Sequence, residues 1–266
     1  MPNRILLTGA AGAAATGLRP LLAARGHRIV LLDIAPVPGP LAPSEAAVQG
    51  SITDAAALDA ALEGVDLVVH LGGFSRERPW PDIAEVNIGG TQLLLERTHL
   101  AGVTRVVLAS STHAVGFHPV GTPVDTMQPR PDTFYGVSKA AMESLGSVYA
   151  DRFGTTVVAA RIGTIEERPS GLRSLSTWLS FADFVRLIEA TATTERRGFH
   201  VVWAVSANTR GWFPLDAGLA IGYRPEDDAE RFAPEIEAST QGEPPVSHGL
   251  IGGAFADDEH PLGGVW

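Results

Sequence analysis

The chain has 266 residues, of which 45% are hydrophobic, a formal net charge of −10 and no cysteine. The acidic balance argues against nucleic acid and anionic membranes as partners, although it is also an ordinary solubility device. Without cysteine there is no disulfide framework, thiolate metal site or cysteine nucleophile, and we expect a cytoplasmic protein without a metal. The chain also lacks the roughly 18 consecutive apolar residues that a membrane span requires.

Short apolar runs alternate with helical patterns along the chain. After the first strand comes a small-residue turn and a helix to about Arg25, and two segments, 36–43 and 168–179, read as loops. The other predicted helices are 55–62, 83–101, 135–153 and 181–191, and the predicted strands are 4–8, 28–33, 65–70, 105–109, 156–162 and 200–204.

This alternation predicts an α/β fold, a Rossmann-type doubly wound parallel sheet with helices on both faces and a small C-terminal substrate-binding extension. We expect one domain, residues 1–266, with the substrate-site elements mainly from 163–266. The tail from about Gly242 is rich in glycine and proline, and we expect it to wrap over the domain or be partly disordered.

A glycine-containing turn, residues 8–15, separates the first strand from the first helix. Gly9 and Gly12 allow a tight turn and close backbone approach, and Ala13 and Ala14 offer backbone amides at a helix N-terminus. These features suit the pyrophosphate of a dinucleotide. Such turns also occur as plain strand-to-helix connections, and that alternative stays open on this motif alone.

Asp33 ends the second strand, 24 residues after Gly9, where a carboxylate can accept hydrogen bonds from the adenosine ribose. The carboxylate would repel a 2′-phosphate, and Ile34 and Ala35 supply no arginine to bind one. The position therefore favours NAD over NADP. The alternative is that Asp33 is only a strand-end turn residue.

Tyr135 and Lys139 lie four residues apart on a predicted helix, so their side chains share one face. Lys139 is the only lysine, since the other 19 of the 20 basic residues are arginine. A nearby ammonium favours the phenolate, and we therefore expect it to lower the Tyr135 pKa so that the phenolate accepts a proton from a substrate hydroxyl. The alternative is an incidental pair on a solvated helix.

Taken together, these motifs resemble the extended short-chain dehydrogenases/reductases, and more narrowly the bacterial NAD-dependent uronate dehydrogenases. The superfamily motifs are Thr8-Gly-x-x-Gly12, Asp33, His70-Leu-Gly-Gly73, Asn87, Ser110-Ser111 and Tyr135-x-x-x-Lys139. The narrower likeness runs through 70–80, 109–113, 130–132, 161–164, 173–178 and Ala207-Asn208.

The resemblance implies NAD-dependent oxidation of the anomeric carbon of D-galacturonate or D-glucuronate to the aldarolactone, in a homo-oligomer. It implies Tyr135 as the base, Lys139 on the nicotinamide ribose and Ser111 on the reacting oxygen. The implied cofactor-binding residues are Gly9, Gly12, Ala13, Ala14, Asp33, Ser51, Ile52, Leu71, Gly72, Gly73, Lys139 and Ile162. The implied substrate-binding residues are Ser75, Ser111, Thr112, His113, Tyr135, Thr164 and Arg173, with Arg173 clamping the carboxylate.

Three positions depart from the family pattern. Ala15 replaces the third glycine of the turn, Ser51 stands where relatives often have an aspartate near the adenine, and Thr112 stands where an asparagine follows the two serines. The last change puts the sugar preference in doubt, although not the hydride chemistry.

Six residues carry alternative interpretations. His70, Trp178 and Trp203 are expected to pack in the core, and Asn87 either supports Lys139 through water or caps a helix. His113 either contacts the sugar or bonds behind it. A surface-loop role is the alternative for Arg173.

Two other functions fit the same fold. A nucleotide-sugar epimerase or dehydratase would need a larger substrate lobe, whereas only 127 residues follow Lys139. A non-catalytic NAD-sensing protein would not need the tyrosine and the lysine. Turnover on a panel of sugars separates these alternatives.

Overall fold

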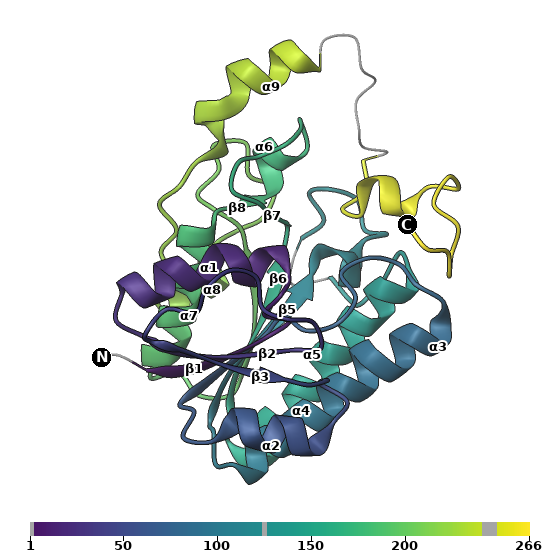
Figure 1. The fold of residues 1–266 in the computed structure, drawn as a ribbon. Coiled ribbons are helices and arrows are strands. Elements are labelled where there is room, and N and C mark those ends of the chain that lie inside the picture. The colour runs from purple at the N-terminus through teal and green to yellow at the C-terminus, as the bar shows by residue number, and fades with distance from the viewer. Residues whose placement is uncertain (1–2, 124–126, 241–248) are drawn as a thin grey trace.

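A seven-stranded parallel sheet forms the centre of the computed structural model, which describes residues 3–123, 127–240 and 249–266 (Figure 1). The strand order is β3-β2-β1-β4-β5-β6-β9, and every pairing is parallel. These strands are β1 (Arg4–Thr8), β2 (Arg28–Asp33), β3 (Glu45–Gln49), β4 (Leu67–His70), β5 (Arg105–Ser111), β6 (Thr156–Ile162) and β9 (Phe199–Ala204). The predicted doubly wound α/β architecture is confirmed.

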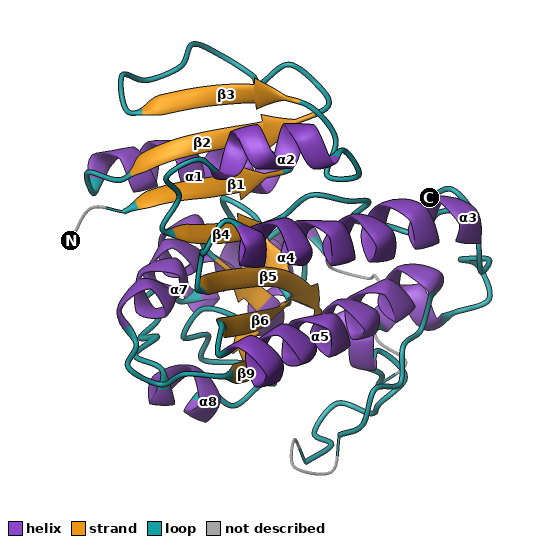
Figure 2. Cartoon of the chain, turned by 90° about the horizontal axis from the view of Figure 1, so that it is seen from below, coloured by secondary structure: helices purple, strands orange, loops and turns teal. Residues whose placement is uncertain are grey.

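Helices cover both faces of the sheet (Figures 1 and 2). On one face lie α1 (Ala13–Ala24), α7 (Phe181–Thr193) and α8 (Asp216–Ala220), and on the other lie α2 (Ala55–Leu62), α4 (Gly90–Leu100) and α5 (Phe134–Phe153). Successive residues of β1 enter different cores, because side chains alternate along a strand. Ile5 and Leu7 pack under α1 and α7, whereas Leu6 packs under α2 and α4.

Smaller elements complete the fold above the carboxyl ends of the strands. They are α3 (Trp80–Asp82), β7 (Thr164–Ile165), α6 (Ser174–Thr177), β8 (Trp178–Leu179), α9 (Ala233–Ser239), a π-helical turn (Ile83–Gly89) and 3₁₀ turns at Thr112–Val115, Ala229–Phe232 and Gly253–Ala256. None of the helices among the described residues is long and apolar enough to cross a membrane.

Two segments differ from the sequence-based prediction. The short strand β3 was not expected, because its sequence Glu-Ala-Ala-Val-Gln has no buried apolar run. It is held by its ladder with β2 and by the buried ion pair between Glu45 and Arg19 of α1, at 2.7 Å. Both β2 and Arg19 lie outside the strand, so the local pattern of β3 does not reveal it.

Residues 168–179 were expected to form a loop, yet they contain α6 and β8. Trp178 begins β8, pairs with Thr164 of β7 and is fully buried, with its ring edge-on to Phe232 at 5.7 Å. The predicted packing role of Trp178 is therefore confirmed. The order in this segment comes from contacts outside it, with β7 just before it and with Phe232 more than fifty positions later.

The described part of the C-terminal tail, residues 249–266, lies over the carboxyl end of the sheet, as expected. The Gly252 amide donates to the Gly116 carbonyl at 2.8 Å, and the Gly263 amide donates to the Glu77 carboxylate at 2.8 Å. The tail was expected to start near Gly242, and residues 241–248 are outside the described residues.

Candidate active site

The turn between β1 and α1 depends on glycine at Gly9. Its φ is +68°, and a Cβ there would lie 2.9 Å from the backbone of Gly72. The Thr8 hydroxyl accepts a hydrogen bond from the Gly72 amide at 3.0 Å, which joins the turn to the end of β4. Gly12 precedes α1 and makes no side-chain cap, so the amides of the first helical turn remain open to an anion.

Asp33 lies at the carboxyl end of β2 beside this turn. One carboxylate oxygen accepts from the Ala11 amide and the other from the Ala35 amide, both at 2.9 Å. The side chain is half-buried, so lone pairs remain for a further donor. Asp33 is thus a turn residue in this structure and is also available to bind a ribose.

Ser51 and Ile52 follow the edge strand β3. The Ser51 hydroxyl bonds the Thr53 hydroxyl at 2.7 Å, and Ile52 is buried against Gly72 and Gly90. With Gly9, Gly12, Ala13, Asp33 and Gly72, these two residues lie around the ends of β1 to β4 and outside the wall of the cavity described next.

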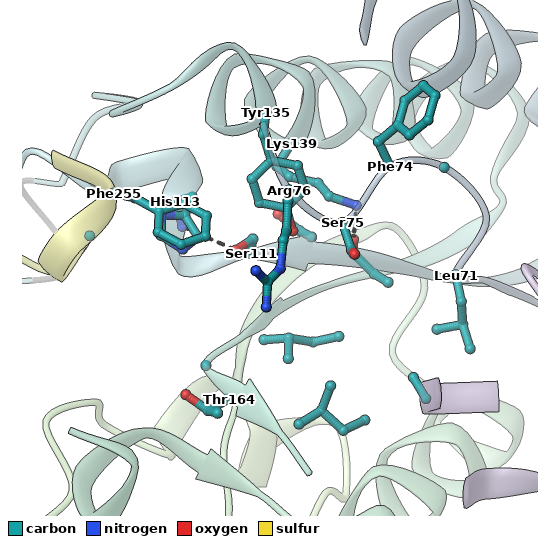
Figure 3. A pocket seen from close by; sticks show the side chains of 18 of the residues that line it. Leu71, Phe74, Ser75, Arg76, Ser111, His113, Tyr135, Lys139, Thr164 and Phe255 are labelled. Atoms are coloured by element: carbon teal, nitrogen blue, oxygen red, sulfur yellow. Dashed lines mark hydrogen bonds between the residues drawn. The ribbon is translucent and has the colours of Figure 1, made fainter. Parts of the chain in front are cut away.

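A cavity of about 450 Å³ opens at the carboxyl ends of β4, β5 and β6 (Figure 3). Parallel sheets bind ligands at this end. Its wall combines residues from both halves of the chain: Ala14, Leu71, Gly73, Phe74, Ser75, Arg76, Ala109, Ser110, Ser111, His113, Tyr135, Lys139, Ile162, Gly163, Thr164, Ile165, Arg173, Gly252, Ala254 and Phe255. All but one of the substrate-binding residues expected from the sequence line it.

The exception is Thr112. Its side chain is buried, with 1% of its surface exposed, and it does not line the cavity. Thr112 begins a 3₁₀ turn directly after β5, where Ser111 and His113 face the cavity instead. The expected contact between Thr112 and the sugar is therefore wrong for this structure.

Tyr135 and Lys139 face the cavity together from the first turns of α5. The Thr133 hydroxyl caps this helix by accepting from the Gly136 amide at 2.9 Å. The Lys139 Nζ lies 5.3 Å from the centroid of the Tyr135 ring and donates to the Ala109 carbonyl at 2.7 Å. The predicted shared helix face is confirmed.

The expected lowering of the Tyr135 pKa is wrong for this structure. Burial raises the pKa of Tyr135 to about 12, although a hydrogen bond with Ser111 opposes that rise. Burial also lowers the pKa of Lys139 to about 8. Both groups are desolvated, and the lysine is bonded to a backbone carbonyl, so its ammonium does not offset the cost of burying a phenolate.

Arg173 approaches the cavity from the segment before α6. Its Nη2 donates to the Ile251 carbonyl at 2.5 Å, and its guanidinium lies 5.0 Å from the centroid of the Trp212 ring. Its Nη1 is buried and has no hydrogen-bond partner within the described residues. Burial lowers the pKa of Arg173 to about 10, so it stays protonated at neutral pH. A buried guanidinium with a free donor beside a cavity suits a carboxylate ligand.

Several residues at this site were not predicted. Phe74 and Arg76 line the cavity from the loop after β4, and Figure 3 shows the Arg76 side chain extending into the cavity. Phe255 reaches the wall from the tail and stacks on His113 at 4.1 Å. Their positions depend on where the loop and the tail lie, and no spacing in the sequence reveals that.

Glu77 was also not predicted as a site residue. Its carboxylate is fully buried and accepts from the backbone amides of Phe134 at 3.1 Å, Tyr135 at 2.7 Å and Gly263 at 2.8 Å. It therefore joins the loop after β4 to the start of α5 and to the tail. An acid at a helix N-terminus also interacts favourably with the helix dipole.

His70 and Asn87 serve internal contacts. His70 is buried between the hydroxyls of Thr8 at 2.8 Å and Thr91 at 3.0 Å, which confirms its packing role, and burial lowers its pKa to about 3. Asn87 sits inside the π-helical turn, where it bonds the backbone of Phe74 and the hydroxyl of Ser138. It does not cap a helix, because it lies between α3 and α4 in continuous helical backbone.

Comparisons with known proteins point to one family. The NAD dependent epimerase/dehydratase family matches residues 5–168. The uronate dehydrogenase of Pseudomonas putida is 38% identical over 258 residues, and the match covers 96% of each chain. The uronate dehydrogenase of Agrobacterium fabrum is 39% identical over 260 residues, covering 96% of this chain and 97% of that one.

The solved structures agree with this likeness. A mutant of the Agrobacterium tumefaciens uronate dehydrogenase in complex with NAD has a TM-score of 0.91 and 37% identity. The superposition covers 98% of this chain and all of that one. The likeness thus extends over the sheet, the turn and the segments that form the cavity.

Proposed function

This chain belongs to the NAD dependent epimerase/dehydratase family and, within it, to the uronate dehydrogenases, and from that premise we propose its reaction. It oxidises the anomeric carbon of a hexuronic acid, D-galacturonate or D-glucuronate, and NAD takes the hydride. The C1 hydroxyl loses its proton and C1 loses a hydride, while the ring oxygen stays in place. The product is therefore the aldarolactone.

The glycine turn suits the cofactor. The backbone of Gly9 approaches Gly72 too closely for a side chain, and the uncapped start of α1 supports pyrophosphate binding at Gly12, Ala13 and Ala14. The Asp33 carboxylate accepts hydrogen bonds from the ribose hydroxyls, and Leu71, Gly73 and Ile162 line the cavity side of the cofactor site. When bound, NAD supplies the hydride acceptor and a positive nicotinamide ring.

Ser51, Ile52 and Gly72 complete the proposed cofactor site near the adenosine. Gly72 is fixed by its bond to Thr8, and Ile52 packs against it. Ser51 is bonded to Thr53 and gives this part of the site a hydroxyl in place of a carboxylate.

Tyr135 is the proton acceptor, with Ser111 on the same substrate oxygen. Burial holds the phenol neutral, so the phenolate forms only when further positive charge enters the site. That charge would come from the positive nicotinamide ring of bound NAD. Lys139, whose Nζ lies 5.3 Å from the centroid of the Tyr135 ring, binds the nicotinamide ribose. Proton transfer is in this way tied to occupation of the cofactor site.

Arg173 holds the substrate carboxylate, and one observation carries this proposal: Arg173 lines the cavity, and its Nη1 has no hydrogen-bond partner among the described residues. Ser75, His113 and Thr164 bind sugar hydroxyls from the surrounding wall. The cavity, about 450 Å³, suits a free sugar acid within the usual range of roughly 300–1,000 Å³ for small-molecule pockets. We further infer one domain, with residues 163–266 supplying the carboxylate-binding side.

A substrate panel tests the reaction. NADH formation is followed with galacturonate, glucuronate, galactose, glucose 6-phosphate and UDP-glucose, each also with Tyr135→Phe as the matched control. Turnover of a uronate alone supports the proposal. Turnover of UDP-glucose but not of uronates would replace it with a nucleotide-sugar enzyme, and tight NAD binding without any turnover would indicate a sensor.

The proposal also includes a cytoplasmic homo-oligomer. The absence of cysteine suits a reducing compartment, and the family resemblance suggests self-association. Light scattering coupled to gel filtration tests the second statement directly, since a mass near 28.0 kDa would contradict it.

A further inference from the structure

Asp132 is a buried carboxylate beside the cavity that the proposed reaction does not use. Its side chain has no exposed surface, and its Oδ2 lies 2.7 Å from Nδ1 of His113. Its Oδ1 accepts from the Thr133 hydroxyl at 3.0 Å. A carboxylate buried away from water needs hydrogen-bond donors from the protein, and the His113 ring is one of the donors that Asp132 has.

Three glycines from separate segments surround this carboxylate. A Cβ at Gly116 would lie 1.9 Å from Asp132 Oδ2, a Cβ at Gly252 would lie 2.0 Å from the same oxygen, and a Cβ at Gly136 would lie 2.9 Å from Oδ1. These glycines belong to the segment after β5, to the tail and to the first turn of α5. The carboxylate therefore occupies a space that only small residues leave open.

The pairing fixes how the proton sits on the His113 ring. An ionised carboxylate only accepts hydrogen bonds, so Nδ1 must carry the proton and neutral His113 keeps its lone pair on Nε2. The ring is also held by stacking on Phe255 at 4.1 Å and by an edge contact with Tyr135 at 5.7 Å.

The other ring nitrogen is left for a ligand. Nε2 has no hydrogen-bond partner within the described residues, while the His113 side chain, 14% exposed, lines the cavity. In Figure 3 His113 lies next to Ser111, on the wall that also carries Tyr135. The His113 ring thus borders the same cavity as the proposed proton acceptor.

We propose that Asp132 is a positioning residue that holds His113 in the Nδ1–H form, so that Nε2 accepts a hydrogen bond from a hydroxyl of the sugar. This inference rests on the proposed oxidation of a hexuronic acid. It makes His113 an acceptor on a wall where Arg173 and Lys139 can only donate. The site then selects a sugar that has a hydroxyl, and not an ether or a bare carbon, opposite Nε2.

The test has a structural part that needs no turnover. Nitrogen-15 NMR of labelled histidine distinguishes a protonated ring nitrogen from one with a free lone pair. The chain has eight histidines, so the His113 signals are assigned by their loss in His113→Phe, which keeps an aromatic ring against Phe255. Wild type should show a protonated Nδ1 and a free Nε2, and Asp132→Ala should lose that preference. A wild-type proton on Nε2 would overturn the proposal.

The kinetic part is a double-mutant cycle. Asp132→Ala should raise KM for the uronate by about tenfold, as expected for one lost hydrogen bond, and leave the Kd for NAD within about twofold. In the His113→Phe background the same substitution should change KM by less than about twofold. An equal loss in both backgrounds would show a merely structural role and overturn the inference.

Asp132→Asn guards against a folding defect, because it keeps the shape of the side chain. It should unfold near the wild-type temperature and show an intermediate rise in KM, since an amide is a weaker acceptor than a carboxylate. A wild-type KM with an altered histidine spectrum would overturn the link to substrate binding. If wild type turns over no uronate while its spectrum is as expected, the proposed reaction fails and the assignment of the ring proton stands.

Discussion

The glycine-turn region, residues 8–15 with Asp33 and residues 71–73, differs from the cavity in how it is built. The turn region is built mainly of backbone groups, which two side chains tie together: the Thr8 hydroxyl accepts from the Gly72 amide, and the Asp33 carboxylate accepts from the Ala11 amide. The cavity depends on side chains brought from β5, α5, β7, the segment at Arg173 and the tail. A site formed by closely approaching backbone restricts the residue types at its positions, whereas substitutions in a site formed by side chains can change which ligand it binds.

Tyr135→Phe should abolish catalysis and leave the turn region intact. Only the proton acceptor is lost, so kcat should fall by roughly 10²–10⁴-fold, the usual contribution of a general base. NAD titration followed by fluorescence should give an unchanged Kd. Retained turnover would remove Tyr135 from the mechanism.

Alkaline pH should also separate wild type from Tyr135→Phe, by their stability. With the pKa of Tyr135 raised to about 12, the phenol ionises only in the unfolded chain between about pH 10 and 12, so wild type loses stability as pH rises through that window. The loss approaches about 2–3 kcal/mol, and Tyr135→Phe lacks it. Urea unfolding of both variants measures the difference, and parallel curves would contradict the buried phenol.

Arg173→Ala should damage the cavity side alone. Loss of a charged hydrogen bond to the carboxylate costs about 1.5–3 kcal/mol, so KM for a uronate should rise by roughly 10- to 100-fold. The Kd for NAD should not change. Arg173→Lys is the matched control, because it keeps the charge without the bidentate geometry. Its KM should lie between those of wild type and Arg173→Ala.

Gly9→Ala should damage the turn region alone. The residue has a φ of +68° and no room for a Cβ beside Gly72, so the free energy of unfolding should fall by about 1–3 kcal/mol. The Kd for NAD should rise, while the KM for a uronate measured at saturating NAD changes little. Gly39→Ala is a useful control, because Gly39 has a φ of +73° and open space around it. Both variants place alanine at a positive φ, but only Gly9→Ala also brings a Cβ into steric conflict with the backbone of Gly72.

Thr112→Ser should have the smallest effect. Thr112 is buried away from the cavity, so the ratio of galacturonate to glucuronate turnover should stay within about twofold of wild type. The measurement is kcat/KM for each sugar. A larger shift in that ratio would show that position 112 reaches the substrate after all.

The structure supports the sequence-based interpretation best where the signals are local. The pair Tyr135 and Lys139 follows from one helical spacing, and the strands follow from buried apolar runs. The strand β3 was not predicted, because its partners, β2 and Arg19, lie elsewhere in the chain. The direction of the Tyr135 pKa shift was predicted wrongly, because desolvation depends on everything packed around the phenol.

The sequence by itself determined the parallel α/β fold, the glycine turn and the shared helix face of Tyr135 and Lys139, because each depends on residues a few positions apart and on periodicities of the backbone. Only the tertiary structure decided which side chains meet at the cavity. Asp132 reaches His113, Glu77 reaches the start of α5 and Phe255 reaches the wall because three distant segments converge there. Burial then shifts the pKa values of Tyr135 and Lys139, because removing water from around a group disfavours its charged form.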